Sequence, residues 1–156
     1  MKRIVLTLVL AWALVFTVAP VATYAQDVEV SGTGTLTAEG DGRATLYGGG
    51  DFSAAAGAGQ LWIYDRHGDA EITVSGEGRL TKTLLANGDI RYYYRGFKGT
   101  ATIRGSDVGI ILKGIDMNLT ATGTGHATLY GSGTYTINGE SGTWSYQGVR
   151  LPLGNE

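Results

Sequence analysis

The chain has 156 residues, of which 26 are glycine and none is cysteine, and its formal net charge is −2 at pH 7. The lack of cysteine excludes a disulfide framework, thiol chemistry and a cysteine-linked lipid anchor. No cluster of basic residues stands out in the sequence, which argues against nucleic acid and anionic membrane surfaces as partners.

The first 25 residues have the three-part pattern of a secretory signal peptide. Lys2-Arg3 precedes an apolar run over residues 4–19, and Thr23-Tyr24-Ala25 places small residues at the −3 and −1 positions of a cleavage site. We therefore predict a signal peptide over 1–25 and a secreted or extracytoplasmic protein, in the periplasm or on the cell surface. The alternative is a retained N-terminal anchor, although the apolar run is near the short limit of a membrane span. Residues 26–156 have the length of one domain.

A nine-residue segment organises this domain. Gly42–Gly50 recurs as Gly125–Gly133 with seven of nine positions identical, and fainter copies begin at Gly68 and Gly99. The four copies start 26, 31 and 26 residues apart. An ungapped shift of 57 residues relates the two halves of the chain, which indicates an internal repeat.

The repeat halves cover residues 42–98 and 99–155. Glycines separate short segments rich in Thr, Val, Ile, Leu and Tyr, which is typical of turns between strands. Because strand side chains alternate, Ala44 and Leu46 are expected to face the core. Arg43, Thr45 and Tyr47 are then expected on the outer face.

Residues 60–65 form the strongest predicted strand. Leu61 and Ile63 face in while Trp62 and Tyr64 face out, or the reverse. Either orientation gives a strand with one apolar face and one aromatic face.

Asn87-Gly88 is the best hairpin signal in the chain. It joins residues 79–86 to residues 89–97, where Tyr92 and Tyr94 share one face. No segment after residue 25 has a helical apolar period, so we predict no helix beyond the signal peptide.

The domain is therefore all-β, and two architectures remain open. If the copies stack in register, Ala44 lies over Ala70 and Ala101 over Ala127, which gives a β-solenoid with an expelled hairpin over 80–97. If neighbouring strands pair as hairpins, the result is an antiparallel β-sandwich or barrel. The fixed 26-residue spacing favours the solenoid.

A pattern of apolar residue, x, Gly, x, Gly occurs at Val30–Gly34, Val74–Gly78 and Leu129–Gly133. It resembles the repeats of bacterial adhesin head domains. The resemblance implies a β-helical, exported domain with an adhesive role and no catalytic residues. The aspartate that often follows this motif in that family is present here as Asp51 and missing after most other copies.

Few residues suit catalysis or metal binding. His67 is expected in a turn and His126 on the outer face, both solvated. Gly48–Phe52 is similar to a calcium-binding nonapeptide, but the tandem copies that such a site needs are missing. We predict no metal and no cofactor.

The carboxylates offer no clear acid–base pair. The candidate carboxylates are Glu39, Asp41, Asp65, Asp69 and Glu71. All of them are expected in turns or on exposed strand faces. Because no acid, base and nucleophile can be assembled, we predict that the protein is not an enzyme.

Aromatic residues are the best candidates for a binding face, because they combine rigid apolar surface with a polar atom. The predicted ligand-binding residues are Tyr47, Trp62, Tyr64, Tyr92, Tyr94, Tyr130 and Trp144. The alternative is that many of them pack in the core or across strands.

The sequence thus predicts an exported, non-enzymatic cell-envelope or surface protein with a structural or adhesive role. The alternative is a carbohydrate-binding module that uses a Tyr/Trp face. The expected partners are a cell-surface glycan or another envelope protein, with self-association through exposed strand edges, and neither nucleic acid nor, after signal cleavage, a membrane.

Overall fold

The computed structural model describes residues 32–154, so the predicted signal peptide lies outside the described residues. Within that range the chain contains no helix, and hence none long and apolar enough to cross a membrane. The all-β prediction is confirmed. The strands are β1 (Gly34–Asp65), β2 (Glu71–Leu84), β3 (Ile90–Ile137), β4 (Glu140–Trp144) and β5 (Val149–Leu153).

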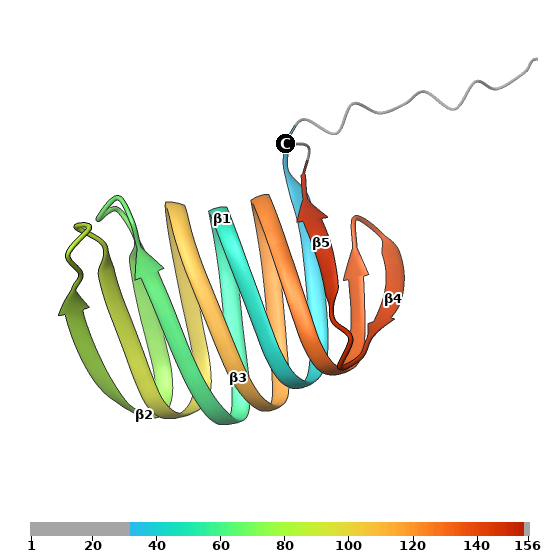
Figure 1. The fold of residues 1–156 in the computed structure, drawn as a ribbon, viewed down its shortest axis with the longest axis horizontal. Coiled ribbons are helices and arrows are strands. Elements are labelled where there is room, and N and C mark those ends of the chain that lie inside the picture. Colours follow the sequence, from blue (N-terminus) through green and yellow to red (C-terminus); the bar gives the residue numbers. More distant parts are fainter. Residues whose placement is uncertain (1–31, 155–156) are drawn as a thin grey trace, which may run out of the picture.

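The two longest strands, β1 and β3, wind side by side into a coil (Figure 1). Along most of its length β1 has β3 partners on both sides. Ala44, for example, lies between Leu112 and Leu129, which are 17 residues apart in β3. β2 adds a strand to β3 at one end of the coil, and β4 and β5 pair with β3 at the other end (Figure 1).

The predicted β-solenoid of stacked copies is not confirmed. Every strand pair within residues 32–154 is antiparallel, and Ala44 pairs with leucines of β3 rather than lying over Ala70. The sheet is not closed into a barrel. Antiparallel pairing agrees instead with the sandwich alternative.

The two copies of the repeat that are most similar in sequence, 42–50 and 125–133, pair with each other. Ala44 lies opposite Leu129 and Leu46 opposite Ala127, so each small apolar side chain has a large partner across the ladder. All four side chains are at most 2 % exposed. The repeated sequence therefore supplies two antiparallel partners of complementary volume.

The predicted hairpin at Asn87-Gly88 is confirmed, but it is not expelled from the sheet. The amide of Leu85 donates to the carbonyl oxygen of Asp89 at 2.8 Å, and Gly88 has a φ of +91°. The register is unbroken from Leu84 opposite Ile90 to Arg79 opposite Arg95, and after one irregularity it resumes with Glu77 opposite Lys98. β2 is thus the edge strand of the main sheet.

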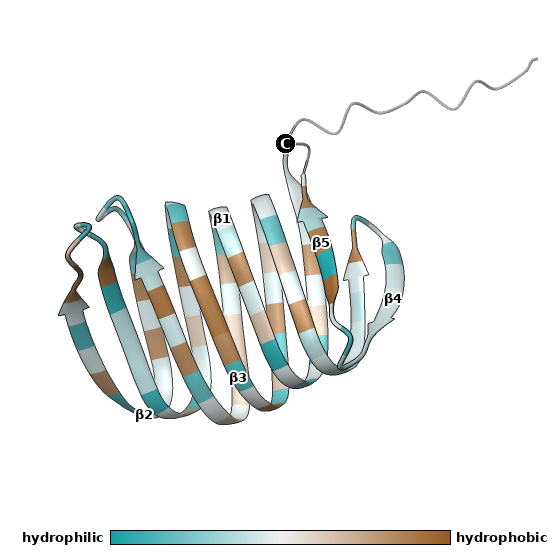
Figure 2. Cartoon of the chain, in the orientation of Figure 1, coloured by the Kyte–Doolittle hydropathy of each residue, from teal (hydrophilic) through white to brown (hydrophobic). Residues whose placement is uncertain are grey.

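The interior of the coil is one hydrophobic core, and apolar and polar residues alternate along β1 and β3 (Figure 2). Ala44 and Leu46 face inward as predicted, and so do Leu61 and Ile63, which places Trp62 outside. Thr45 has the predicted outward phase but is only 8 % exposed, because its neighbours on the outer face cover it.

Glycines mark the corners where the chain leaves one wall of the coil for the other. A Cβ atom on Gly42, whose φ is +133°, would lie 2.1 Å from the carbonyl oxygen of Tyr130. Gly131, the register partner of Gly42, shows the same approach to the carbonyl oxygen of Asp41. Only glycine permits this conformation and this distance.

The corners divide the coil into two walls that enclose the core. One, which we call the basic wall, comprises residues 43–47, 60–64, 79–83, 91–95, 109–113, 126–130 and 150–152. The other, which we call the hydroxyl wall, comprises residues 35–39, 51–55, 71–75, 100–104, 118–122, 134–136 and 141–143.

Candidate binding surface

Four of the predicted ligand-binding aromatics project outward from the basic wall. Tyr130 is 44 % exposed, whereas Tyr47, Trp62 and Tyr64 are partly buried by their neighbours. The fold adds Tyr93, which is the register partner of Trp62 and was not among the predicted residues. An outward aromatic group therefore exists, drawn from β1 and β3.

The faces of the Trp62 ring are occupied within the protein. Tyr93 stacks on it with ring centroids 4.8 Å apart and an interplanar angle of 12°. The ammonium group of Lys113 lies 5.3 Å from the Trp62 ring centroid and comes from the neighbouring segment on the other side. The indole thus presents its edge rather than a free face, and its contacts with Tyr93 and Lys113 hold all three side chains in place.

Tyr47 is covered in a similar way. The His126 ring lies 5.6 Å away, and the guanidinium carbon of Arg66 lies 5.4 Å from the Tyr47 ring centroid. On its other flank Tyr47 lies across Gly109, where a Cβ atom would approach the ring to 2.9 Å. The space left by this glycine lets the tyrosine pack against the wall.

Three predicted aromatic residues do not belong to this face. Tyr92 and Tyr94 pack against the core, and burial raises the pKa of the Tyr94 hydroxyl. Trp144 is only 5 % exposed, so the prediction that it is exposed is wrong. Gly40 and Gly133 lie within van der Waals reach of its indole and make room for it over the end of the core.

Basic residues dominate the outer surface of the basic wall. In the paired register, Arg79 lies opposite Arg95, and Arg43 lies opposite Lys113. Six cationic side chains share the outward phase: Arg43, Arg79, Arg91, Arg95, Lys113 and Arg150. They are far apart in the sequence, so the expectation that no basic cluster exists is wrong in three dimensions.

No aspartate or glutamate occupies the outward phase of the basic wall within residues 32–154. The two ion pairs found in this part of the chain lie elsewhere: Arg66 with Asp107 at 3.6 Å, and Arg104 with Asp51 on the hydroxyl wall. Like charges directly opposite each other on a sheet are destabilising. An external anion would relieve that repulsion.

A small polar cluster joins the loop after β1 to β3. The Ser106 hydroxyl oxygen lies 3.0 Å from His67 Nδ1, and the Ser106 amide donates to Asp69 Oδ2 at 3.1 Å. The hydrogen bond from the Ser106 side chain lowers the pKa of Asp69. In a catalytic triad the histidine lies between the hydroxyl and the carboxylate. Here Ser106 lies between His67 and Asp69, so the cluster does not have that order.

Two of the other candidate carboxylates, Asp65 and Asp41, accept hydrogen bonds from the backbone. Asp65 is 2 % exposed, which corrects its predicted exposure, because its carboxylate accepts the Gly68 amide at 2.7 Å and closes the turn. Asp41 accepts the Asp116 amide at 2.8 Å. Within residues 32–154 no three His, Asp or Glu side chains are grouped so as to hold a metal ion.

No family model, no curated protein and no solved structure matches the chain. The resemblance to adhesin head domains therefore stays a prediction. The outer surfaces of the two walls are the features that bear on function.

Proposed function

We propose that the protein is an exported, non-enzymatic binding protein of the cell envelope or surface, with an adhesive role, and that its basic wall holds an acidic polysaccharide. The observation that carries this proposal is the outward group of six cations with no carboxylate among them. Structural or adhesive work at a cell surface needs an extended contact of this kind rather than a catalytic pocket.

The geometry favours an extended anionic ligand. One row across the wall holds Arg79, Arg95, Gln60, Lys113 and Arg43 as successive register partners. Neighbouring strands lie about 4.8 Å apart, so a chain lying along this row meets two pairs of cations with Gln60 between them. Guanidinium groups bind carboxylate and sulfate oxygens with two parallel hydrogen bonds. A uronate or sulfate between Arg43 and Lys113 would replace their mutual repulsion with two attractions.

The aromatic contacts favour a glycan over nucleic acid. Single-stranded nucleic acid gains much of its affinity by stacking bases on aromatic side chains. The two faces of Trp62 are covered by Tyr93 and Lys113, which leaves ring edges and the Tyr130 hydroxyl as contacts. Such groups suit the hydroxyls and acidic groups of a sugar polymer.

The test is binding of the purified protein to polygalacturonate, with neutral dextran and single-stranded DNA as comparison polymers. We expect saturable binding to polygalacturonate that weakens as salt rises, because exposed charges are screened. The variant Arg43→Gln/Lys113→Gln loses up to about fivefold in affinity per cation, the equivalent of about 1 kcal/mol for each exposed ion pair.

The matched control is Arg104→Gln, which removes a cation from the hydroxyl wall instead. It keeps full affinity if the basic wall is the site. Equal loss in both variants, equal binding to dextran, or tighter binding to DNA would each contradict the proposal.

Self-association is a second proposal, and the edge strand β2 supports it. β2 pairs only with β3, and its Leu80 and Leu84 side chains are 48 % and 73 % exposed. An exposed apolar edge is a template for pairing with another chain. Sedimentation velocity should show a concentration-dependent dimer that Leu80→Lys/Leu84→Lys removes, and a monomer at every concentration would refute it.

A further inference from the structure

The outer surface of the hydroxyl wall carries an unbroken row of hydroxyl side chains. Each member is the register partner of the next, so the row crosses the coil at right angles to its strands. The row consists of Thr73, Thr102, Ser53, Thr120, Thr37, Thr136 and Ser141.

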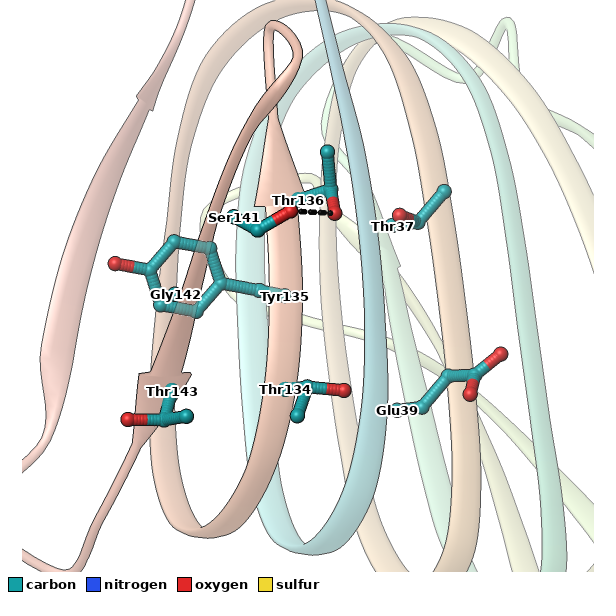
Figure 3. Close-up of a pocket in the computed structure, with 8 residues that line it drawn as sticks. All are labelled: Thr37, Glu39, Thr134, Tyr135, Thr136, Ser141, Gly142 and Thr143. Atoms are coloured by element: carbon teal, nitrogen blue, oxygen red, sulfur yellow. Dashed lines mark hydrogen bonds between the residues drawn. The ribbon is translucent and has the colours of Figure 1, made fainter.

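A second row runs beside the first, two residues along each strand. Four of its seven members are hydroxyl residues, in the order Ser75, Thr100, Ala55, Asn118, Glu39, Thr134 and Thr143. Figure 3 shows the end of both rows lining a shallow, open hollow, with Thr37, Thr136 and Ser141 at one level and Glu39, Thr134 and Thr143 at the next.

The sheet sets both spacings of this array. Neighbouring strands lie about 4.8 Å apart, and side chains on one face recur about every 6.8 Å along a strand. The hydroxyls therefore occupy a two-dimensional grid rather than a cluster. Both spacings are close to repeats of the oxygen lattice on the prism faces of hexagonal ice.

The grid is held firmly. Threonine is branched at Cβ, which restricts its χ1 angle, and the strands beneath are anchored by Leu36, Leu119 and Ala121, each at most 3 % exposed. Thr136 and Ser141 also share a hydrogen bond of 3.0 Å between their hydroxyl oxygens (Figure 3). Little side-chain freedom remains to be lost on binding.

We propose that the hydroxyl wall binds ice. One exposed hydroxyl gains little by exchanging a bond to water for a bond to a ligand. A crystal face engages every member of the array at once, so many small gains act together. The threonine methyl groups restrict the water molecules around them, which favours an already ordered layer next to the hydroxyls.

The charges of this wall lie mainly to one side of the two rows. Glu71, Arg104 and Asp51 belong to a third row, in which Arg104 is the register partner of both carboxylates. Within the two hydroxyl-bearing rows only Glu39 is charged, and its carboxylate accepts a hydrogen bond of 2.8 Å from the Asn118 side chain. The main row is thus free of charge over its whole length.

The test is a measurement of thermal hysteresis and of ice-crystal shape with the full chain purified as the cell releases it. We expect faceted crystals and a gap between melting and freezing points. Thr120→Lys, in the middle of the main row, should lose most of the gap, because a long charged side chain holds the ice away from its neighbours. Thr120→Ser keeps the hydroxyl but lacks the methyl group, and should lose part of the gap.

The matched control is Thr81→Lys, the same substitution on an exposed threonine of the basic wall. It should keep the whole gap, and circular dichroism should show all variants folded. Round crystals and no gap with the parent protein would overturn the proposal, as would equal gaps for Thr120→Lys and the parent. Binding to crystalline cellulose or chitin without any effect on ice would also overturn it.

This inference is independent of the acidic-glycan proposal, because the two surfaces lie on opposite walls of the coil. Thr120→Lys should leave binding to polygalacturonate unchanged. If the parent protein shows only one of the two activities, the proposal for the other activity has failed.

Discussion

The basic wall and the hydroxyl wall have the same backbone architecture but different outer surfaces. Both are built from antiparallel segments of β1 and β3 over one shared core. The outward positions of one wall hold six cations and no carboxylate, whereas those of the other hold two rows rich in threonine and serine. The period of two residues separates the side chains that stabilise the fold from the side chains that meet a ligand.

Their charges also differ in arrangement. On the hydroxyl wall Arg104 lies between Glu71 and Asp51, so its neighbours across the ladder attract it. On the basic wall Arg43 lies next to Lys113. The first arrangement stabilises the sheet and the second opposes it, which is the pattern expected where a surface serves binding at a cost in stability.

The largest effect should come from a change that breaks both walls at once. Gly42→Ala places a methyl group 2.1 Å from a carbonyl oxygen at a φ that only glycine tolerates. We expect a loss of about 4 kcal/mol in unfolding free energy, from backbone strain and overpacking together. Urea denaturation measures it. Gly68→Ala, where nothing lies within 4 Å, is the control and should cost about 1 kcal/mol.

The next test asks whether the walls contribute equally to the core. Leu112 lies beneath the basic wall and Leu119 beneath the hydroxyl wall, and both are at most 1 % exposed. Each substitution to alanine should cost about 3 kcal/mol. Thermal unfolding followed by circular dichroism compares them. If only one of the two is destabilising, the core is not shared by the walls.

A charge reversal sharpens the contrast in electrostatics. Lys113→Glu places a carboxylate opposite Arg43, so the unfolding free energy should rise by up to about 1 kcal/mol at low salt while binding to polygalacturonate falls. On the hydroxyl wall Asp51→Lys places a cation opposite Arg104 and should lower stability. Denaturation at low and high salt tests both. Unchanged stability in Lys113→Glu would mean that the repulsion is already screened.

The smallest expected effect concerns the pKa of Asp69, which lies at a corner of the coil rather than on a wall. The pKa of Asp69 is lowered by its hydrogen bond with Ser106, so the contribution of Asp69 to stability is present above the unfolded value of 3.8 and is lost as pH falls through the folded pKa. The Ser106 amide signal should titrate in NMR with a midpoint below 3.8, and Asp69→Asn should abolish that titration. A midpoint above 3.8 would contradict the assignment.

Local patterns in the sequence predicted much of the secondary structure. The alternation around Ala44 and Leu46 identified the inward face, and Asn87-Gly88 identified the hairpin, whereas the alternation over residues 60–65 left both orientations open. Both signals are local, because strand phase and turn type depend on residues a few positions apart. Trp144 escaped this reasoning, because its burial depends on Gly40 and Gly133 in other strands.

The spacing of the sequence copies did not predict how the strands pair. A fixed spacing of copies is compatible with stacked parallel strands and with antiparallel partners, and only the volumes across the ladder distinguish them. Ala44 opposite Leu129 fills the core evenly, whereas Ala44 over Ala70 would leave it underpacked. The sequence contains these volumes but not the register that brings them together.

By itself, the sequence determined the class of structure, because the two-residue period, the glycine punctuation and the hairpin dipeptide are short-range properties of the chain. The tertiary structure decided which side chains share a surface. Cations as far apart as Arg43 and Arg150 reach one wall, and hydroxyls as far apart as Thr37 and Ser141 reach one row, only because a turn of the coil takes about 17 residues. That length is set by core packing and by the positions of the corner glycines, and neither can be read from any one segment.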